Sequence, residues 1–215
     1  MGDKIVRIKK ENQIYYGGDQ KWFAKVRNQN MGCGIIASAN LVKTIEAKDN
    51  GLYTVQYVDY ISLAERIAKG YVYVLPRFGI NGVFLSLGIN LYFIVHNIPY
   101  IAMWGTRKNL LWSEIQRMLD DGLSVILAVG PNKFSKIRKV SLPLYVKNKG
   151  TYVCYTTTKA HYVTITDMSD DYLTVSSWGE KFFINKNELM EYAYKYSNFL
   201  FTNVLVVRRR RNEKN

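Results

Sequence analysis

Residues 160–179 read AHYVTITDMSDDYLTVSSWG, and this stretch decides the class of fold. Alternation of apolar and polar residues predicts one strand over 161–166 and a second over 172–178. Residues 168–171 between them, Met-Ser-Asp-Asp, have the composition of a turn, so we expect the two strands to form a hairpin. That hairpin would place a histidine at the start of one strand and a polar, aromatic segment at the end of the next.

Strands dominate the last third of the chain, whereas helices dominate the part that precedes it. Further strands are expected at 99–103, 124–129, 152–155, 181–184 and 199–207. Helices are expected from about Cys33 to 49–51, and at 60–69, 82–95, 110–119 and 186–194; residues 130–149 are expected to form a basic loop. This order predicts an α+β fold, with N-terminal helices packed on a C-terminal antiparallel sheet.

The length and composition indicate one globular unit. The chain has 215 residues, of which 48% are hydrophobic and 22% charged, and it shows no repeat or low-complexity linker. We therefore expect a single domain over 1–207. Four consecutive arginines begin at Arg208, and terminal runs of charge are usually solvated, so residues 208–215 are expected to form a disordered basic tail.

Charge and hydropathy restrict the partners and the location. The formal net charge is +13, but the lysines and arginines are scattered, so we do not expect a nucleic-acid site. Residues 83–104 are largely apolar yet include Ser86, Asn90 and Pro99, so we interpret them as core and expect no membrane span. The polar N-terminus has no apolar signal core, which favours a cytoplasmic location, although a signal peptide already removed would leave the same start.

The cysteine and histidine content argues against disulfides and metals. Two cysteines, Cys33 and Cys154, cannot supply a disulfide framework. Together with the two histidines, their spacing matches no zinc pattern. We expect no metal and no cofactor.

Cys33 is the candidate nucleophile. It lies in Met31-Gly32-Cys33-Gly34, where a helix is expected to begin, and the helix dipole would stabilise its thiolate and lower its pKa. The glycines, including Gly34, would let a substrate or another backbone segment approach closely. A small buried core cysteine is the alternative interpretation.

His161 is the candidate general base, because the start of a strand entering the core fixes the orientation of its ring. The other histidine, His96, ends an apolar helix and is expected to be structural. Across the hairpin, a serine of Val175-Ser176-Ser177-Trp178-Gly179 could orient the imidazole through its second nitrogen. Trp178 is expected to pack over this contact, with simple core packing as the alternative.

These residues resemble the papain-like cysteine peptidases in order and spacing. Cys33 precedes His161 by 128 residues and Ser176 by 143, and Ser-Ser-Trp-Gly stands where that family has an Asn-Ser-Trp-Gly type motif. Gly-Cys-Gly is most similar to the bacterial branch that includes the leader-peptide-cleaving, double-glycine peptidase domains of bacteriocin exporters. The resemblance implies the papain-like fold and a thiol hydrolase.

The resemblance also implies an oxyanion-hole glutamine upstream of the nucleophile. Gln20-Lys21-Trp22 stands one residue short of the family's Gln-x-x-Trp spacing, so Gln20 would donate beside the backbone N–H of Cys33. Gln29 and Asn28 lie closer in the sequence and are alternatives.

The residue that orients His161 is the main departure from the family, which has Asn or Asp there. Alignment of the motif selects Ser176, which we take as the prediction. The hydrophobic register instead favours Ser177, because it shares the face of Val175, as Val163 shares that of His161. A serine hydroxyl can accept the imidazole hydrogen bond but supplies no charge to stabilise imidazolium.

The expected function is cleavage of a peptide or isopeptide bond in a peptide or protein substrate, through a thioester on Cys33. The alternative is a catalytically weak or inactive relative that binds peptides or a protein partner. Binding to nucleic acid or to an anionic surface through the basic residues is a third possibility.

Overall fold

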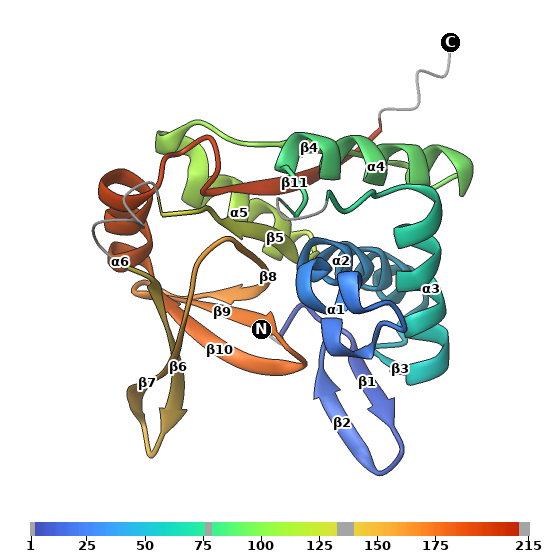
Figure 1. Cartoon of the computed structure of the whole chain (residues 1–215), viewed down its shortest axis with the longest axis horizontal. Helices are drawn as coiled ribbons and strands as arrows, with labels where there is room; N and C mark the ends of the chain where they lie inside the picture. The colour runs from blue at the N-terminus through green and yellow to red at the C-terminus, as the bar shows by residue number, and fades with distance from the viewer. Residues whose placement is uncertain (1–2, 76–78, 133–139, 211–215) are drawn as a thin grey trace.

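The computed structural model describes residues 3–75, 79–132 and 140–210, and its main feature is a sheet of eight strands in which every neighbouring pair is antiparallel. Helices and this large sheet confirm the predicted α+β class (Figure 1). In spatial order the strands are β4 (Tyr100–Trp104), β11 (Asn203–Arg209), β5 (Val125–Val129), β8 (His161–Met168), β9 (Tyr172–Ser177), β10 (Glu180–Asn185), β6 (Leu142–Asn148) and β7 (Thr151–Thr158).

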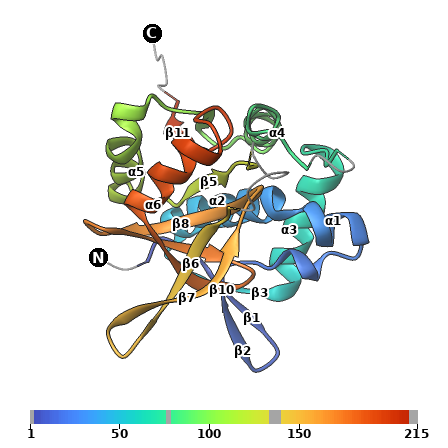
Figure 2. The same cartoon turned by 60° about the vertical axis from the view of Figure 1, so that its left-hand side comes forward.

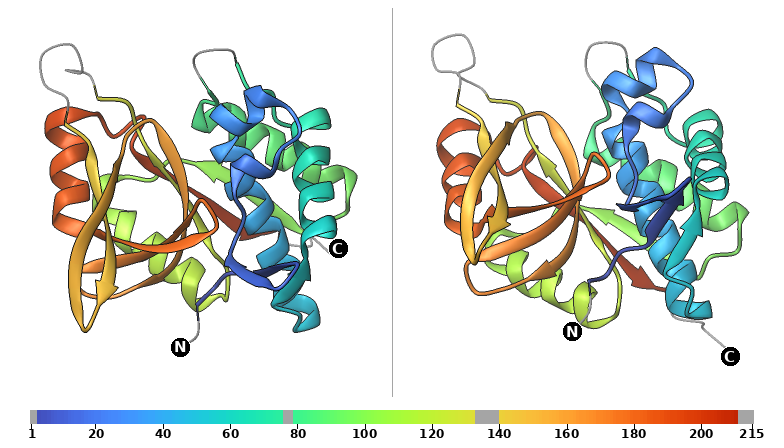
Figure 3. Two further views of the ribbon diagram at one scale, coloured as in Figure 1. Left: turned by 60° about the horizontal axis from the view of Figure 1, so that its bottom comes forward. Right: turned by 90° about the horizontal axis from the view of Figure 1, so that it is seen from below.

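The helices precede most of these strands in the chain, as predicted. They are α1 (Val26–Met31), α2 (Cys33–Asn50), α3 (Tyr57–Gly70), α4 (Gly82–Val95), α5 (Leu111–Asp120) and α6 (Lys186–Glu191). Figure 3 shows α1, α2 and α3 on one side of the molecule and the orange strands on the other. Figure 2 shows α5 and α4 on opposite sides of β11.

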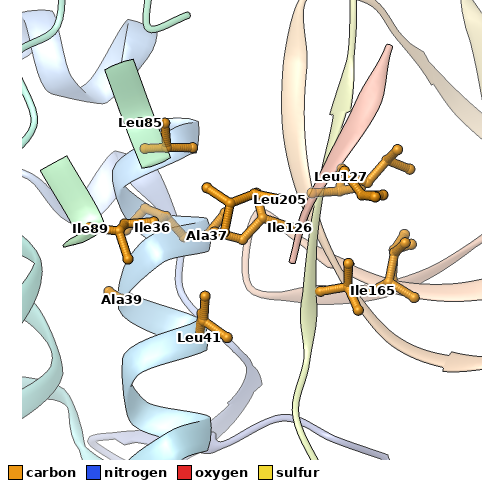
Figure 4. Packing of buried hydrophobic residues seen from close by; sticks show 14 of the residues in the cluster. Ile36, Ala37, Ala39, Leu41, Leu85, Ile89, Ile126, Leu127, Ile165 and Leu205 are labelled. Atoms are coloured by element: carbon orange, nitrogen blue, oxygen red, sulfur yellow. The ribbon is translucent and has the colours of Figure 1, made fainter. Parts of the chain in front are cut away.

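Helix α2 lies at the centre of the fold, because nearly all side chains in its first ten residues are apolar or small. Residues Gly34 to Leu41 are buried without interruption, and the helix ends where Gly51 adopts a left-handed conformation with φ of 75°. In Figure 4, Leu85 and Ile89 of α4 lie on one side of α2, and Ile126 and Ile165 of the sheet lie on the other. This packing fixes the start of α2, and hence Cys33, against β5 and β8.

The pattern of apolar residues missed two parts of the fold. Strand β6 lies within the segment predicted to be a loop, because its basic surroundings and Pro143 obscure the alternation. A second, three-stranded sheet joins β1 (Arg7–Lys10) to β2 (Gln13–Tyr16) and β3 (Thr54–Gln56). Its strands are short and polar, so nothing in their composition distinguishes them from loops.

The predicted boundary of the C-terminal tail is wrong. Strand β11 continues through Arg209, with Arg208 opposite Ile101 and Arg209 opposite Tyr100 of β4. The backbone N–H of Arg210 then donates to the carbonyl of Pro99 at 2.9 Å. Backbone pairing with the edge strand therefore orders the first arginines despite their charge; residues 211–215 lie outside the described part of the chain.

Two truncations should distinguish the contribution of these arginines to stability from that of the residues that follow them. Deleting 211–215 should leave the free energy of unfolding unchanged, whereas deleting 208–215 should lower it by about 1–3 kcal/mol, because hydrogen bonds to β4 are lost at about 1 kcal/mol each. The ion pair of Arg208 with Glu114 is exposed and adds little. Denaturant unfolding of the two proteins would measure the difference, and equal midpoints would contradict it.

Within residues 3–75, 79–132 and 140–210, no helix is both long enough and apolar enough to cross a bilayer.

Candidate active site

Cys33 is the first residue of α2 and lines a narrow pocket. The same pocket is lined by Gln20, His161, Ser177 and Trp178, residues that are far apart in the sequence. Gly32 ends α1 and precedes α2, and a β-carbon there would come within 2.4 Å of the Asn28 carbonyl oxygen. Glycine is therefore required for the tight junction that presents the thiol.

His161 begins strand β8, and its orientation is set from β9. Its Nε2 lies 2.8 Å from Oγ of Ser177. Because Thr164 is opposite Ser176 in the β8–β9 ladder, Ser177 falls on the His161 face of the hairpin, one diagonal step away. The ladder confirms the predicted hairpin. The contact with Ser177 occupies Nε2 of His161, so Nδ1 is the ring nitrogen that does not take part in it.

Ser176 does not contact His161 in this arrangement. Its hydroxyl is buried and donates to the backbone carbonyl of Tyr16 at 2.5 Å. Geometry therefore replaces Ser176 with Ser177 as the residue that contacts the imidazole, because side chains alternate between the two faces of a strand. The register of apolar residues, rather than the alignment of the motif, identifies the serine that hydrogen-bonds to His161.

Trp178 covers His161 from the turn that follows β9. The two rings stack with centroids 4.7 Å apart and an interplanar angle of 21°. Trp178 and Gly179 form the two-residue connection between β9 and β10, and both have positive φ, 50° and 74°. A tryptophan in the left-handed conformation is costly, so the turn stores strain at the position that places the ring over the histidine.

Two substitutions at Trp178 are expected to separate ring packing from backbone strain. Trp178→Ala should lower the free energy of unfolding by about 2 kcal/mol, less than for a fully buried aromatic residue because Trp178 is only half-buried. Trp178→Gly loses the same contacts but tolerates positive φ, so it should be about 1 kcal/mol more stable than the alanine variant. Denaturant unfolding measures both; a wild-type midpoint for Trp178→Ala would show that the stacking contributes nothing.

The structure distinguishes between the two glutamines considered for the oxyanion hole. Gln20 lines the pocket with Cys33, and its Nε2 donates to the Gln29 carbonyl at 2.7 Å, which uses one of its two N–H groups. The Gln29 side chain does not line this pocket; its Nε2 donates to the carbonyl of Phe23 at 2.7 Å. Gln29 thus holds the loop that carries Gln20.

A buried polar network fixes the segment that leads into Gln20. Asn40 of α2 accepts hydrogen bonds from the Gly18 N–H at 3.1 Å and from the Tyr60 hydroxyl at 2.7 Å, and it donates to Thr164 of β8 at 3.0 Å. Asn40 therefore connects α2, α3, β8 and the Gly18 segment, and it lines the same narrow pocket as Cys33. The sequence contains a signal for this network, since Asn40 interrupts the run of apolar and small residues that begins α2.

Burial controls the protonation of both candidate catalytic groups. It raises the pKa of the Cys33 thiol, although the backbone at Tyr162, Gly34 and Cys33 acts in the opposite direction. It also lowers the pKa of His161 from its ordinary 6.5 to about 4. The expectation of a lowered thiol pKa is therefore wrong: the dehydration of the charged forms outweighs the helix N-terminus, so thiol and imidazole are both neutral near pH 7.

A wider pocket of about 560 Å³ adjoins the narrow one and shares Cys33 and His161 with it. Sequence reasoning missed its walls, because they come from separate loops and strands. Its lining is largely apolar and includes Met31, Ile80, Trp104, Val129 and Phe201.

Within the described part of the chain, no three His, Cys, Asp or Glu side chains are grouped so that they could hold a metal ion.

Comparison with known proteins finds a likeness among solved structures but none among sequences. No protein-family model matches the sequence, and no curated protein matches it. The chain is similar to the crystal structure of a provisionally named C39-like peptidase from Bacillus anthracis, with 12% sequence identity, a TM-score of 0.46, and coverage of 90% of this chain and 94% of that one. The likeness is one of overall form. The case for a function rests on the residues of the two pockets.

Proposed function

We propose that this protein is a thiol acyl hydrolase that cleaves a peptide or isopeptide bond, with Cys33 as nucleophile, His161 as general base and Ser177 as the residue that positions His161. The hydrogen bond between Nε2 of His161 and Ser177 carries the proposal. It fixes the ring in the pocket that Cys33 also lines and leaves Nδ1 available to the thiol.

The reaction follows from the neutral state of the pair. As the sulfur of Cys33 attacks the substrate carbonyl, its proton passes to Nδ1 of His161, and the oxyanion is bound by the Cys33 N–H and the remaining N–H of Gln20. The imidazolium then gives the proton to the leaving amine, and a thioester forms on Cys33. Water, deprotonated by the same imidazole, hydrolyses the thioester and regenerates the thiol.

The wider pocket supports a substrate with an apolar group beside the scissile bond. Because it shares Cys33 and His161 with the narrow pocket, a side chain held there lies next to the reacting atoms. Its volume of about 560 Å³ exceeds that of a single side chain, so it can take an aromatic or branched residue together with adjoining backbone.

A second function, peptide binding without turnover, is favoured by one observation. Ser177 offers His161 no negative charge, and burial holds the imidazole neutral, so the imidazolium intermediate is less stabilised than beside a carboxylate. The same apolar pocket would then serve to bind the peptide.

The two functions are separated by following peptide hydrolysis and thioester formation by mass spectrometry, using a mixed peptide pool rich in apolar residues. Turnover should be lost in Cys33→Ala and retained in Cys154→Ala, the matched control, because Cys154 is exposed on β7 and lines neither pocket. Peptides retained by the wild type without cleavage or a thioester would establish the binding function instead.

A further inference from the structure

The outer surface of helix α4 is exceptional among the helices. All of its exposed residues are apolar: Val83, Phe84, Leu87, Leu91, Ile94 and Val95. In α5, by contrast, the exposed residues are Ser113, Gln116 and Asp120. We call the exposed residues of α4 the α4 outer face.

These side chains are well exposed to solvent. Phe84 is 63% exposed, Leu87 57% and Ile94 56%. The opposite side of the helix, with Leu85 and Phe93, is buried in the core. A helix that is apolar all round is normally enclosed on both sides, so the α4 outer face requires a cover that the chain itself does not supply in its described residues.

The surroundings of the α4 outer face carry positive charge. No acidic residue occurs between Glu65 and Glu114, a segment that includes all of α4. The exposed residues Arg209 and Arg210 lie near the segment that follows α4, because Arg209 is opposite Tyr100 and the Arg210 N–H donates to the Pro99 carbonyl. The side chain of Arg208 instead pairs with Glu114 of α5 at 2.7 Å.

We propose that the α4 outer face docks on the surface of an anionic lipid bilayer, with Arg209 and Arg210 bound to the headgroups. Apolar side chains beside clustered arginines complement an interface in which acyl chains lie beneath negative charge. Helix α4 has 14 residues and so extends about 21 Å, which is too short to span a hydrocarbon core of about 30 Å but is suited to lying in its plane.

Charge distinguishes the bilayer from a second copy of the chain. Each copy has a formal charge of +13, and each has Arg209 and Arg210 near the segment that follows α4. A self-associated pair would bring these like charges toward one another, whereas an anionic bilayer neutralises them. The docking does not depend on the chemistry of Cys33.

Vesicle co-sedimentation tests the proposal with the full chain. With vesicles of phosphatidylcholine and about 30 mol% phosphatidylglycerol, the wild type and Cys33→Ala should both sediment, and partitioning should fall at least about tenfold in Leu87→Asn/Leu91→Asn. The matched control Ile14→Asn/Val58→Asn removes two apolar residues that are 68% and 67% exposed elsewhere, and it should sediment like the wild type. Pure phosphatidylcholine vesicles, or about 0.5 M salt, should weaken binding of the wild type.

Three results would overturn the proposal. The first is that the wild type does not bind anionic vesicles. The second is that Leu87→Asn/Leu91→Asn and the single variant Leu91→Asn both bind as well as the wild type. The third is that the protein self-associates without lipid and that the α4 substitutions abolish this association. The last result would assign the α4 outer face to a second copy. Circular dichroism and thermal unfolding of each variant would establish that it retains the fold.

Discussion

Replacing His161 by alanine is expected to lower kcat/KM for peptide hydrolysis about a thousandfold, within the range by which a positioned general base accelerates proton transfer. The effect should be large because the Cys33 thiol, its pKa raised by burial, has little thiolate to react without a base. Ser177→Ala should cost less, about tenfold, since it loosens the ring without removing it.

The other histidine provides the control for this measurement. His96 lies beyond the end of α4, where its Nε2 is 3.3 Å from the Tyr71 hydroxyl, and it lines neither pocket. His96→Ala should therefore leave kcat/KM unchanged. Equal losses in the two histidine variants, or none in either, would contradict the role assigned to His161.

The wild type is expected to lose about 3 kcal/mol more stability than His161→Gln when the pH falls from about 7 to about 4. Burial lowers the pKa of His161 from 6.5 to about 4 in the folded protein, so in this window the unfolded chain binds a proton that the folded chain does not. The contribution of His161 to the free energy of unfolding is thus complete above pH 6.5, and it is lost as the pH falls from 6.5 to about 4.

The glutamine variant isolates this contribution. Its neutral amide can keep a hydrogen bond to Ser177, and the carboxylates that titrate in the same window are common to both proteins and cancel in the difference. Denaturant unfolding at a series of pH values gives the two curves. Parallel curves would show that His161 is hydrated and titrates normally in the folded state.

The sequence was informative where a pattern repeats along one element. Helix α4 was predicted at its observed bounds, and the β8–β9 hairpin was predicted from the alternation that surrounds Val163 and Val175. Cys33 at the start of α2 and His161 at the start of β8 were found in the same way, because an element's first residue is signalled by the residues that follow it.

Contacts between distant elements could not be predicted. The pairing of Arg208 and Arg209 with β4 depends on a strand about a hundred residues earlier, so local composition suggested a disordered tail. His161 hydrogen-bonds to Ser177, which the apolar register of the two strands favoured, and not to Ser176, which alignment of the motif selected. The pKa of Cys33 is raised because other residues pack around the thiol. The sequence indicated only that Cys33 begins a helix, which favours a lower pKa.

The pH dependence of Cys33 alkylation, measured with iodoacetamide in a Cys154→Ser protein, tests the pairing of thiol and imidazole most directly. Two neutral partners predict slow alkylation near pH 6, a rate still rising above about pH 9, and a decrease of about tenfold near neutral pH when His161 is replaced by alanine. A Cys33 rate that is indifferent to His161 at every pH would contradict the proposed site.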